Sequence, residues 1–162
     1  MLSLNAHLPD EPATLALGAA MAASLEPGLV IYLSGELGAG KTTLVRGVLR
    51  ALGHAGAVKS PTYTLVEVYE ISRLHLHHFD FYRFQDPREW IDAGFRESFN
   101  GRNVGLIEWP ERAGGLLPPA DTQITLTASG CGRNASLQAS SPTGIQFLEQ
   151  VASRFPFSPT IS

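Results

Sequence analysis

Apolar side chains recur along the chain with two periods, one typical of helices and one typical of strands. The continuous apolar run over residues 29–33 suits a strand that is covered on both faces, as in a parallel sheet. From residue 44 to residue 52, apolar residues recur every three or four positions, which predicts an amphipathic helix. A preceding helix is predicted from residue 11 to about residue 25, because Asp10 can cap it and Pro12 fits its first turn.

The remaining pattern predicts further strands with helices between them. Strands are expected over 62–69, 74–81 and 104–107, and helices over 86–99 and 142–151. Segments 121–128 and 134–139 alternate as the two strands of an antiparallel hairpin with its turn at 129–132. This order predicts one α/β domain over residues 1–154, with a mainly parallel central sheet flanked by helices and a C-terminal antiparallel hairpin. Residues 155–162 are expected to form a flexible tail.

Composition narrows the class of protein. The chain has 162 residues, 44% hydrophobic and 17% charged, which is typical of a soluble globular domain. Its net charge of −3 argues against a broad basic surface for nucleic acid. Cys131 is the one cysteine, which is ordinary in a reducing cytosol. No basic residue precedes Lys41, and the apolar stretch 13–25 is too short to span a bilayer, so we expect a cytoplasmic protein without a membrane partner.

A glycine-rich loop follows the first predicted strand and carries the strongest chemical signal. Residues 35–42, Gly-Glu-Leu-Gly-Ala-Gly-Lys-Thr, match the P-loop pattern G-x-x-x-x-G-K-[ST]. Glycines let such a loop wrap a phosphate with its N–H groups inward, and the following helix directs its positive end to the same place. Lys41 adds a charge for the β- and γ-phosphates, and Thr42 offers a hydroxyl to Mg²⁺. The sequence therefore predicts a P-loop NTPase domain.

Two carboxylates are candidates for the metal side of this site. Asp80 and Glu108 each end a predicted strand, where open α/β sheets bind their ligands. His75, His77 and His78 suggest a metal cluster, but a strand directs His78 away from the other two and no fourth ligand follows at a suitable spacing. A polar strand face is the better interpretation of the three histidines.

The nucleotide and the reaction are less sharply defined by the residues. The N-K-x-D motif of guanine-specific GTPases is missing from the sequence, which favours ATP. One alternative is a small-molecule kinase, whose lid could draw on Arg88, Arg96 and Arg102. Another is an interaction module that responds to a bound nucleotide, with hydrolysis only incidental.

Four segments in succession resemble the signatures of the TsaE (formerly YjeE) family. They are GELGAGKTT over 35–43, KSPTYTLVE over 59–67, HFDFYR over 78–83 and IEWPE over 107–111. The second is far more specific than the P-loop, which many enzymes share. The resemblance covers residues 8 to about 150.

The resemblance implies a function that the residues alone do not show. Members of this family bind ATP with Mg²⁺ and hydrolyse it slowly, as the ATPase component of bacterial tRNA N6-threonylcarbamoyladenosine synthesis. They associate with TsaD and TsaB, which transfer the threonylcarbamoyl group to adenosine 37 of tRNA. We therefore expect ATP or ADP and Mg²⁺ as cofactors, TsaB and TsaD as partners, and contact with tRNA only through that complex.

The resemblance also implies roles for single residues. Leu37, Gly38, Ala39, Gly40, Lys41 and Thr42 are expected to contact the phosphates, with Thr43 near the α-phosphate. Thr42 is expected to hold Mg²⁺, and Thr62 to sense the γ-phosphate. Asp80 takes the Walker B-like place, and Glu108 is either a metal-side ligand or the group that orients the attacking water. Trp109 is expected near the nucleotide or a partner surface, or as an aromatic residue packed beside Pro110. By position alone, residues 7–11 and the hairpin around Arg133 are candidates for the adenine pocket.

Overall fold

A seven-stranded sheet organises the chain, and three α-helices pack on it within the residues that the structure describes. The structure is a computed structural model that describes residues 1–61, 64–71, 73–86, 88, 94–113 and 115–158. The strands are β1 (Leu2–Leu8), β2 (Val30–Ser34), β3 (Val66–Ile71), β4 (Leu74–Asp80), β5 (Val104–Glu108), β6 (Thr122–Ser129) and β7 (Gly132–Ala139). The helices are α1 (Glu11–Ala22), α2 (Lys41–Ala51) and α4 (Pro142–Ala152), with short 3-10 helices η1 (Phe95–Ser98) and η2 (Pro110–Ala113). None of the described helices is long and apolar enough to cross a membrane.

The sheet is parallel at its centre and antiparallel at both edges. Its strand order is β1-β7-β6-β2-β5-β4-β3, in which β2 pairs in parallel with β5 and β6, and β4 pairs in parallel with β5. The pairs β1–β7, β6–β7 and β3–β4 are antiparallel. The predicted α/β class, the parallel centre and the C-terminal hairpin are thus confirmed, and the edge hairpins make the whole sheet mixed.

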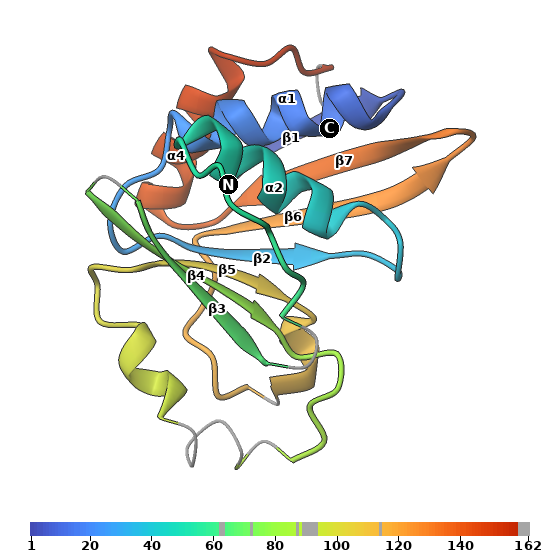
Figure 1. The fold of residues 1–162 in the computed structure, drawn as a ribbon. Coiled ribbons are helices and arrows are strands. Elements are labelled where there is room, and N and C mark those ends of the chain that lie inside the picture. Colours follow the sequence, from blue (N-terminus) through green and yellow to red (C-terminus); the bar gives the residue numbers. More distant parts are fainter. Residues whose placement is uncertain (62–63, 72, 87, 89–93, 114, 159–162) are drawn as a thin grey trace.

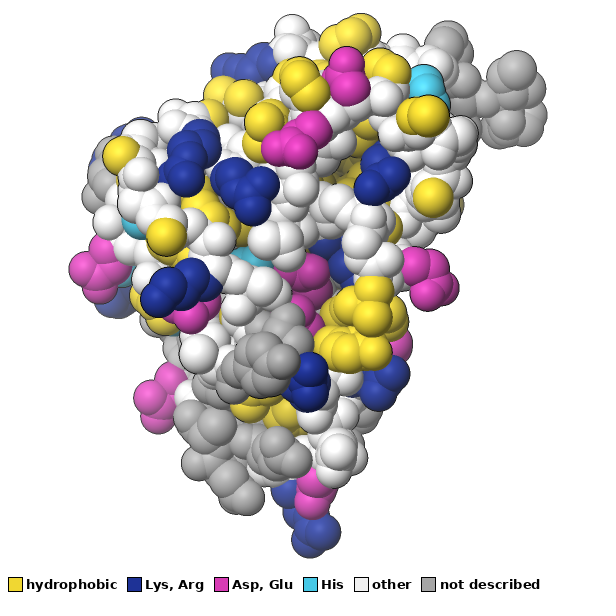
Figure 2. All heavy atoms as spheres, turned by 45° about the vertical axis from the view of Figure 1, so that its right-hand side comes forward, with side chains coloured by type: hydrophobic (Ala, Val, Ile, Leu, Met, Phe, Trp, Pro, Cys, Tyr) yellow, Lys and Arg dark blue, Asp and Glu magenta, His cyan; other side chains and the backbone are white. Residues whose placement is uncertain are grey.

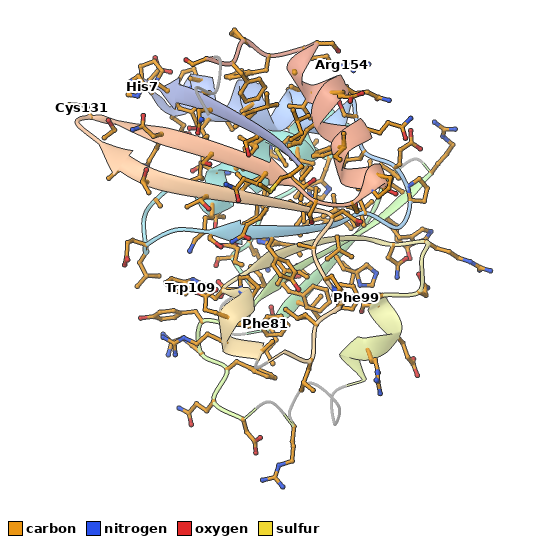
Figure 3. The ribbon with its side chains drawn as sticks, turned by 180° about the vertical axis from the view of Figure 1, so that it is seen from behind. His7, Phe81, Phe99, Trp109, Cys131 and Arg154 are labelled. Atoms are coloured by element: carbon orange, nitrogen blue, oxygen red, sulfur yellow. The ribbon has the colours of Figure 1, made fainter. Side chains whose placement is uncertain are left out.

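Apolar side chains cover both faces of the sheet. Helices α1, α2 and α4 gather on one side (Figure 1), where their buried faces join Ile31 and Leu33 of β2 in the larger core. The neighbouring residue Val30 points the opposite way, into a second cluster with Phe79 and Phe81. Figure 3 shows Phe81 on the side of the sheet away from these helices. This two-sided burial explains why β2 is a continuous apolar run in the sequence.

Helices α1 and α2 approach each other through glycines. A Cβ placed on Gly18 would lie 2.6 Å from the carbonyl oxygen of Leu44, and one on Gly47 would lie 2.7 Å from that of Leu15. Contacts this short are closer than any side chain tolerates, so both helices need glycine at the crossing. The close contact fixes α2 against α1 and thereby fixes the N-terminus of α2, which faces the glycine-rich loop.

Three segments differ from the sequence expectations. The N-terminal strand β1 was not expected; its pairing with β7, 125 or more residues away in the chain, leaves no local signal beyond a short alternation. Strand β3 begins at Val66 instead of residue 62, and residues 62–63 lie outside the described part. Within the expected helix 86–99, the described residues form only the 3-10 helix η1, and residues 87 and 89–93 lie outside the described part.

The segment after α4 packs against the domain, although the sequence assigns it to a flexible tail. Phe155 and Phe157 pack against the larger core, and their ring centroids lie 5.3 Å apart. The backbone N–H of Ser158 donates to the carbonyl oxygen of Asn5 at 2.8 Å, so this segment adds a bridge to β1. The packing of these two aromatic side chains against the core accounts for the position of residues 155–158. Residues 159–162 lie outside the described part.

Candidate functional site

The glycine-rich loop joins the end of β2 to the start of α2. Gly35 has a φ of 145°, and a Cβ on it would lie 2.5 Å from the carbonyl oxygen of Leu126, so the loop backbone passes directly against β6. Gly40 precedes α2 with a left-handed φ of 102°, a conformation that glycine adopts at low cost. The first N–H groups of α2 have no partners within the helix and open onto the loop, which makes this end an anion-binding position.

Lys41 lies buried at the base of this loop, with 4% of its surface exposed. Its Nζ donates to the carbonyl oxygen of Gly35 and lies 4.0 Å from the ring centroid of Trp109. Burial lowers the pKa of Lys41, and the nearby carboxylates Glu108 and Asp80 act in the opposite direction. The side chain is therefore a desolvated cation with acidic neighbours, placed where a phosphate would meet it.

Asp80 and Glu108 lie side by side at the carboxyl ends of neighbouring parallel strands. They are register partners on β4 and β5, and Glu108 also pairs with Leu33 of β2, just ahead of the loop. Both are nearly buried, with 4% and 3% of their surfaces exposed. Asp80 Oδ1 accepts the backbone N–H of Tyr82 at 2.8 Å. The sheet thus brings both carboxylates to the edge that carries the glycine-rich loop, as expected for an open α/β sheet.

His78 is a buried partner of Glu108. Its Nε2 lies 2.5 Å from Oε2 of Glu108, and its side chain is fully buried. The prediction of a polar strand face is therefore wrong for His78, although the opposite orientation of His77, which contacts Ser98 Oγ at 3.1 Å, agrees with strand alternation. The one sequence feature that could have predicted the burial of His78 beside the site is that positions 78 and 80 share a strand face. No local pattern indicates that β5 lies beside β4, so the pairing of His78 with Glu108 could not be predicted.

Trp109 lies at the edge of the sheet that carries the glycine-rich loop, in the segment that follows β5 (Figure 3). Its φ of 57° is a left-handed conformation that bulky residues rarely adopt, and such strain is most often found at functional sites. The ring contacts Lys41 and lies 5.1 Å from the ring centroid of Tyr82. Trp109 thus lies beside the glycine-rich loop, and it also packs against the second apolar cluster, as expected for a packed aromatic residue.

Arg133 connects the C-terminal hairpin to the glycine-rich loop. From β7, its Nε donates to the carbonyl oxygen of Ala39 at 2.7 Å, and a terminal nitrogen donates to that of Gly38 at 2.9 Å. Because the guanidinium holds the carbonyl groups of the loop, it restricts the orientation of the peptide planes that carry the N–H groups. Arg133 therefore has a direct structural role in the loop, which its position in the sequence did not reveal.

These groups line one cavity of about 230 Å³. The lining residues are Leu37, Gly38, Gly40, Lys41, Thr42, Thr43, Ser60, Asp80, Glu108, Trp109 and Arg133. Acidic side chains lie in a hollow near the centre of the face in Figure 2, bordered by hydrophobic side chains. Of the predicted site residues, the cavity includes all but Ala39 and Thr62. Ala39 is buried in the larger core, and Thr62 lies outside the described residues.

A second cavity of about 210 Å³ adjoins the first at Gly40, Thr43 and Arg133. Its other lining residues are Asp10, Glu11, Thr14 and Cys131. The structure thus brings together the two segments that were candidates for the adenine pocket, the start of α1 and the hairpin. Both segments therefore lie next to Thr43 at the end of the glycine-rich loop.

The donor set fits Mg²⁺ better than a transition metal. Within the described ranges, no three His, Cys, Asp or Glu side chains form a metal-binding group. Mg²⁺ prefers oxygen ligands and usually binds through one or two carboxylates together with waters and substrate phosphates. The hydroxyl of Thr42 and the carboxylates of Asp80 and Glu108 line the same cavity and match this chemistry.

Comparisons with known proteins identify the family to which the chain belongs. The family model described as "Threonylcarbamoyl adenosine biosynthesis protein TsaE" matches residues 8–135. A relative from Haemophilus influenzae, named tRNA threonylcarbamoyladenosine biosynthesis protein TsaE, is 45% identical over 149 residues, which cover 89% of this chain and 94% of the relative. A protein of the same name from Bacillus subtilis is 40% identical over 122 residues, which cover 75% of each chain.

A solved structure has the same fold. The crystal structure of Bacillus subtilis YdiB superposes with a TM-score of 0.81 at 29% sequence identity, covering 94% of this chain and 95% of YdiB. The P-loop NTPase fold thus fits the architecture of the chain. The match of the family model over most of the chain, together with these relatives, shows that the chain belongs to the TsaE family of threonylcarbamoyl adenosine biosynthesis proteins.

Proposed function

We propose that this protein is a Mg²⁺-dependent ATPase of tRNA N6-threonylcarbamoyladenosine biosynthesis that acts with TsaB and TsaD. The observation that carries the proposal is the convergence of the loop 35–43, Asp80 and Glu108 on one cavity. Membership of the TsaE family supports the pathway, because the relatives are named for the biosynthesis of this modified nucleoside. The resemblance of the sequence motifs supports the two partners.

The groups at the cavity that support phosphate binding are backbone N–H groups, the ammonium group of Lys41 and the side chain of Thr43. The loop and the first turn of α2 offer backbone N–H groups, which favour anions at a helix N-terminus. The Nζ of Lys41 offers a charge for the β- and γ-phosphates, and Thr43 lies where the first cavity meets the second. The second cavity would then take the nucleoside, with ATP favoured because the guanine-binding motif N-K-x-D is missing.

The carboxylates support hydrolysis. Mg²⁺ would be held by Thr42 with Asp80 or Glu108, and when bound it neutralises charge on the phosphates. Glu108 can accept a hydrogen bond from water and so orient it for attack on the γ-phosphate. Desolvated surroundings strengthen both interactions, because Asp80 and Glu108 are almost fully buried.

Phosphate release from Mg²⁺-ATP, with the chain alone and with TsaB–TsaD, tests the proposal. We expect slow release by the chain alone, faster release in the complex, and tRNA modification that depends on this chain. Thr42→Ala and Glu108→Gln are expected to lower kcat by about 100-fold or more, because each removes a group from the reacting centre. Thr143→Ala and Glu149→Gln change the same residue types on the exposed side of α4 and are expected to leave kcat unchanged.

Other outcomes separate the alternatives. Transfer of a labelled γ-phosphate to a metabolite instead of water would identify a kinase. Repeated rounds of tRNA modification with a non-hydrolysable ATP analogue would identify an interaction module that needs only the bound nucleotide. Full tRNA modification by both the Thr42→Ala and the Glu108→Gln proteins would contradict the proposed mechanism.

A further inference from the structure

His78 is a polar side chain in a place where packing alone favours an apolar one. Its ring is fully buried in β4, and its Nδ1 has no hydrogen-bond partner among the described residues. A buried nitrogen without a partner destabilises the folded state, and an apolar side chain of similar size would avoid this cost. The presence of an imidazole at this position therefore calls for a role besides packing.

Among the described neighbours of His78, Glu108 is the polar group that its ring contacts. Its register partners are Leu106 on β5 and Glu67 on β3. Glu67 is turned to a different group, because its Oε1 accepts from Thr64 Oγ1 at 3.1 Å. The ring instead contacts Oε2 of Glu108 at 2.5 Å.

We propose that His78 is a positioning residue that fixes the carboxylate of Glu108. In this arrangement Nε2–H of the imidazole donates to Oε2 of Glu108, which as a carboxylate only accepts. This is the one hydrogen bond that the side chain of Glu108 makes with the described residues, so Oε1 remains for a ligand in the cavity that Glu108 lines. The inference rests on the proposed function, in which Glu108 orients water or binds on the metal side. Hydrogen-bonded support of this kind is common behind reactive carboxylates.

The position of the proton on His78 gives a test that needs no activity. In protein labelled with ¹⁵N-histidine, His78 is one of five histidines and is assigned by the signal that His78→Gln removes. We expect Nε2 of His78 to carry a proton, and we expect its resonance to shift in Glu108→Ala. A bare Nε2 would overturn the proposal, because the hydrogen bond would then run from Glu108 to the ring.

Three substitutions test the effect on turnover. His78→Gln keeps an amide N–H at nearly the same reach as Nε2, whereas His78→Asn places its amide near the position of Nδ1 and His78→Leu has no donor. We expect His78→Leu and His78→Asn to lower kcat by about 10-fold or more, with the Kd for ADP changed less than about two-fold. His78→Gln is expected to keep kcat within about three-fold of the wild type. His77→Gln on the same strand is the matched control and leaves both constants unchanged.

Two results would overturn the positioning role. The first is a His78→Leu protein with the turnover of the wild type. The second is an equal loss in all three variants, accompanied by a parallel loss of ADP affinity, which is the pattern of a purely structural residue. A wild-type protein that releases no phosphate alone or with TsaB–TsaD would refute the proposed function instead, and the proton position on His78 would still decide the hydrogen bond to Glu108.

Discussion

At Lys41 a single residue combines a cost to folding with the phosphate-binding role proposed for it. The ring of Trp109 and the carbonyl oxygen of Gly35 surround its ammonium group, and burial lowers its pKa. The folded protein thus holds a cation with less hydration than it would have in water. Burial disfavours the positive charge of Lys41 in the empty site. The same burial would strengthen the attraction between this charge and a bound phosphate.

The lowered pKa predicts a pH dependence of stability that Lys41→Met would lack. Between the folded-state pKa of Lys41 and its ordinary value of 10.5, the unfolded chain binds more protons than the folded protein. The free energy of unfolding of the wild type relative to Lys41→Met should therefore be level at lower pH and should rise as the pH increases through this window. Urea unfolding of both proteins from neutral pH to about pH 10.5 measures the difference.

The other lysine, Lys59, offers a control for the loss of an exposed side chain. Lys59→Met is carried through the same series of unfolding measurements. A difference between wild type and Lys41→Met that falls with increasing pH would contradict the direction of the pKa shift.

At the residue level, the sequence was informative where chemistry depends on a local pattern. Lys41 and Thr42 are adjacent in the P-loop pattern, and their placement in the cavity was predicted from spacing alone. The contact between His78 and Glu108 joins residues 30 positions apart on two strands. It could not be predicted, because nothing in either segment specifies which strand will be its neighbour.

Among the elements, the hairpin β6–β7 stabilises the loop that it was not expected to touch. Arg133 donates to the carbonyl oxygens of Gly38 and Ala39, which lie about 95 residues earlier in the chain. The guanidinium suits this position because it is planar and holds several donors in a fixed fork. The hairpin thereby supports the peptide groups on which phosphate binding depends.

Substitution of Arg133 should weaken nucleotide binding more than folding. Arg133→Met removes the two hydrogen bonds to the loop, of about 0.5–1.5 kcal/mol each, so we expect the Kd for ADP to rise about ten-fold. Arg133→Lys should not restore the affinity, because one ammonium cannot donate to both carbonyl oxygens with the same geometry. Isothermal titration calorimetry with ADP measures both variants.

Arg154→Met is the control for the loss of an exposed arginine, since the Arg154 side chain donates to Gln150 and Ser153 of its own segment. The support role of Arg133 would be refuted by an Arg133→Met protein with wild-type ADP affinity.

Element prediction succeeded or failed according to how locally each element is determined. The amphipathic period identified α2, and the capping residue Asp10 identified the start of α1, where its Oδ1 accepts the N–H of Ala13 at 2.9 Å. The edge strand β1 and the ordered segment up to Ser158 were not expected, since each is held by a partner far away in the chain. These segments owe their structure to pairing with distant parts of the chain, and such pairing cannot be seen in a local sequence pattern.

At the scale of the whole molecule, charge bears on the proposed role in tRNA modification. The chain has 12 Lys and Arg against 15 Asp and Glu, and on the face shown in Figure 2 the two kinds are interspersed. Proteins that bind RNA through its phosphates usually gather basic residues into a patch or stripe. Contact with tRNA is therefore expected through the partner proteins.

We predict that this chain alone binds tRNA weakly, with a Kd above about 1 µM at physiological salt. The physical reason is the shortage of clustered cations, which leaves few counterions to be released from the tRNA on binding. Fluorescence anisotropy with labelled tRNA, with the chain alone and after addition of TsaB–TsaD, measures the difference. Sub-micromolar binding by the chain alone would contradict the charge argument.

The sequence by itself determined the features that depend on neighbours along the chain. These are the phosphate-binding pattern over 35–42, the amphipathic helix behind it, and the positions of Asp80 and Glu108 at strand ends. The tertiary structure decided that β4 lies beside β5, which makes the two carboxylates register partners, and that Arg133 reaches the loop. Side-chain periodicity records whether a residue is buried but carries no information on which strand it will meet, and that choice follows from packing of the whole sheet.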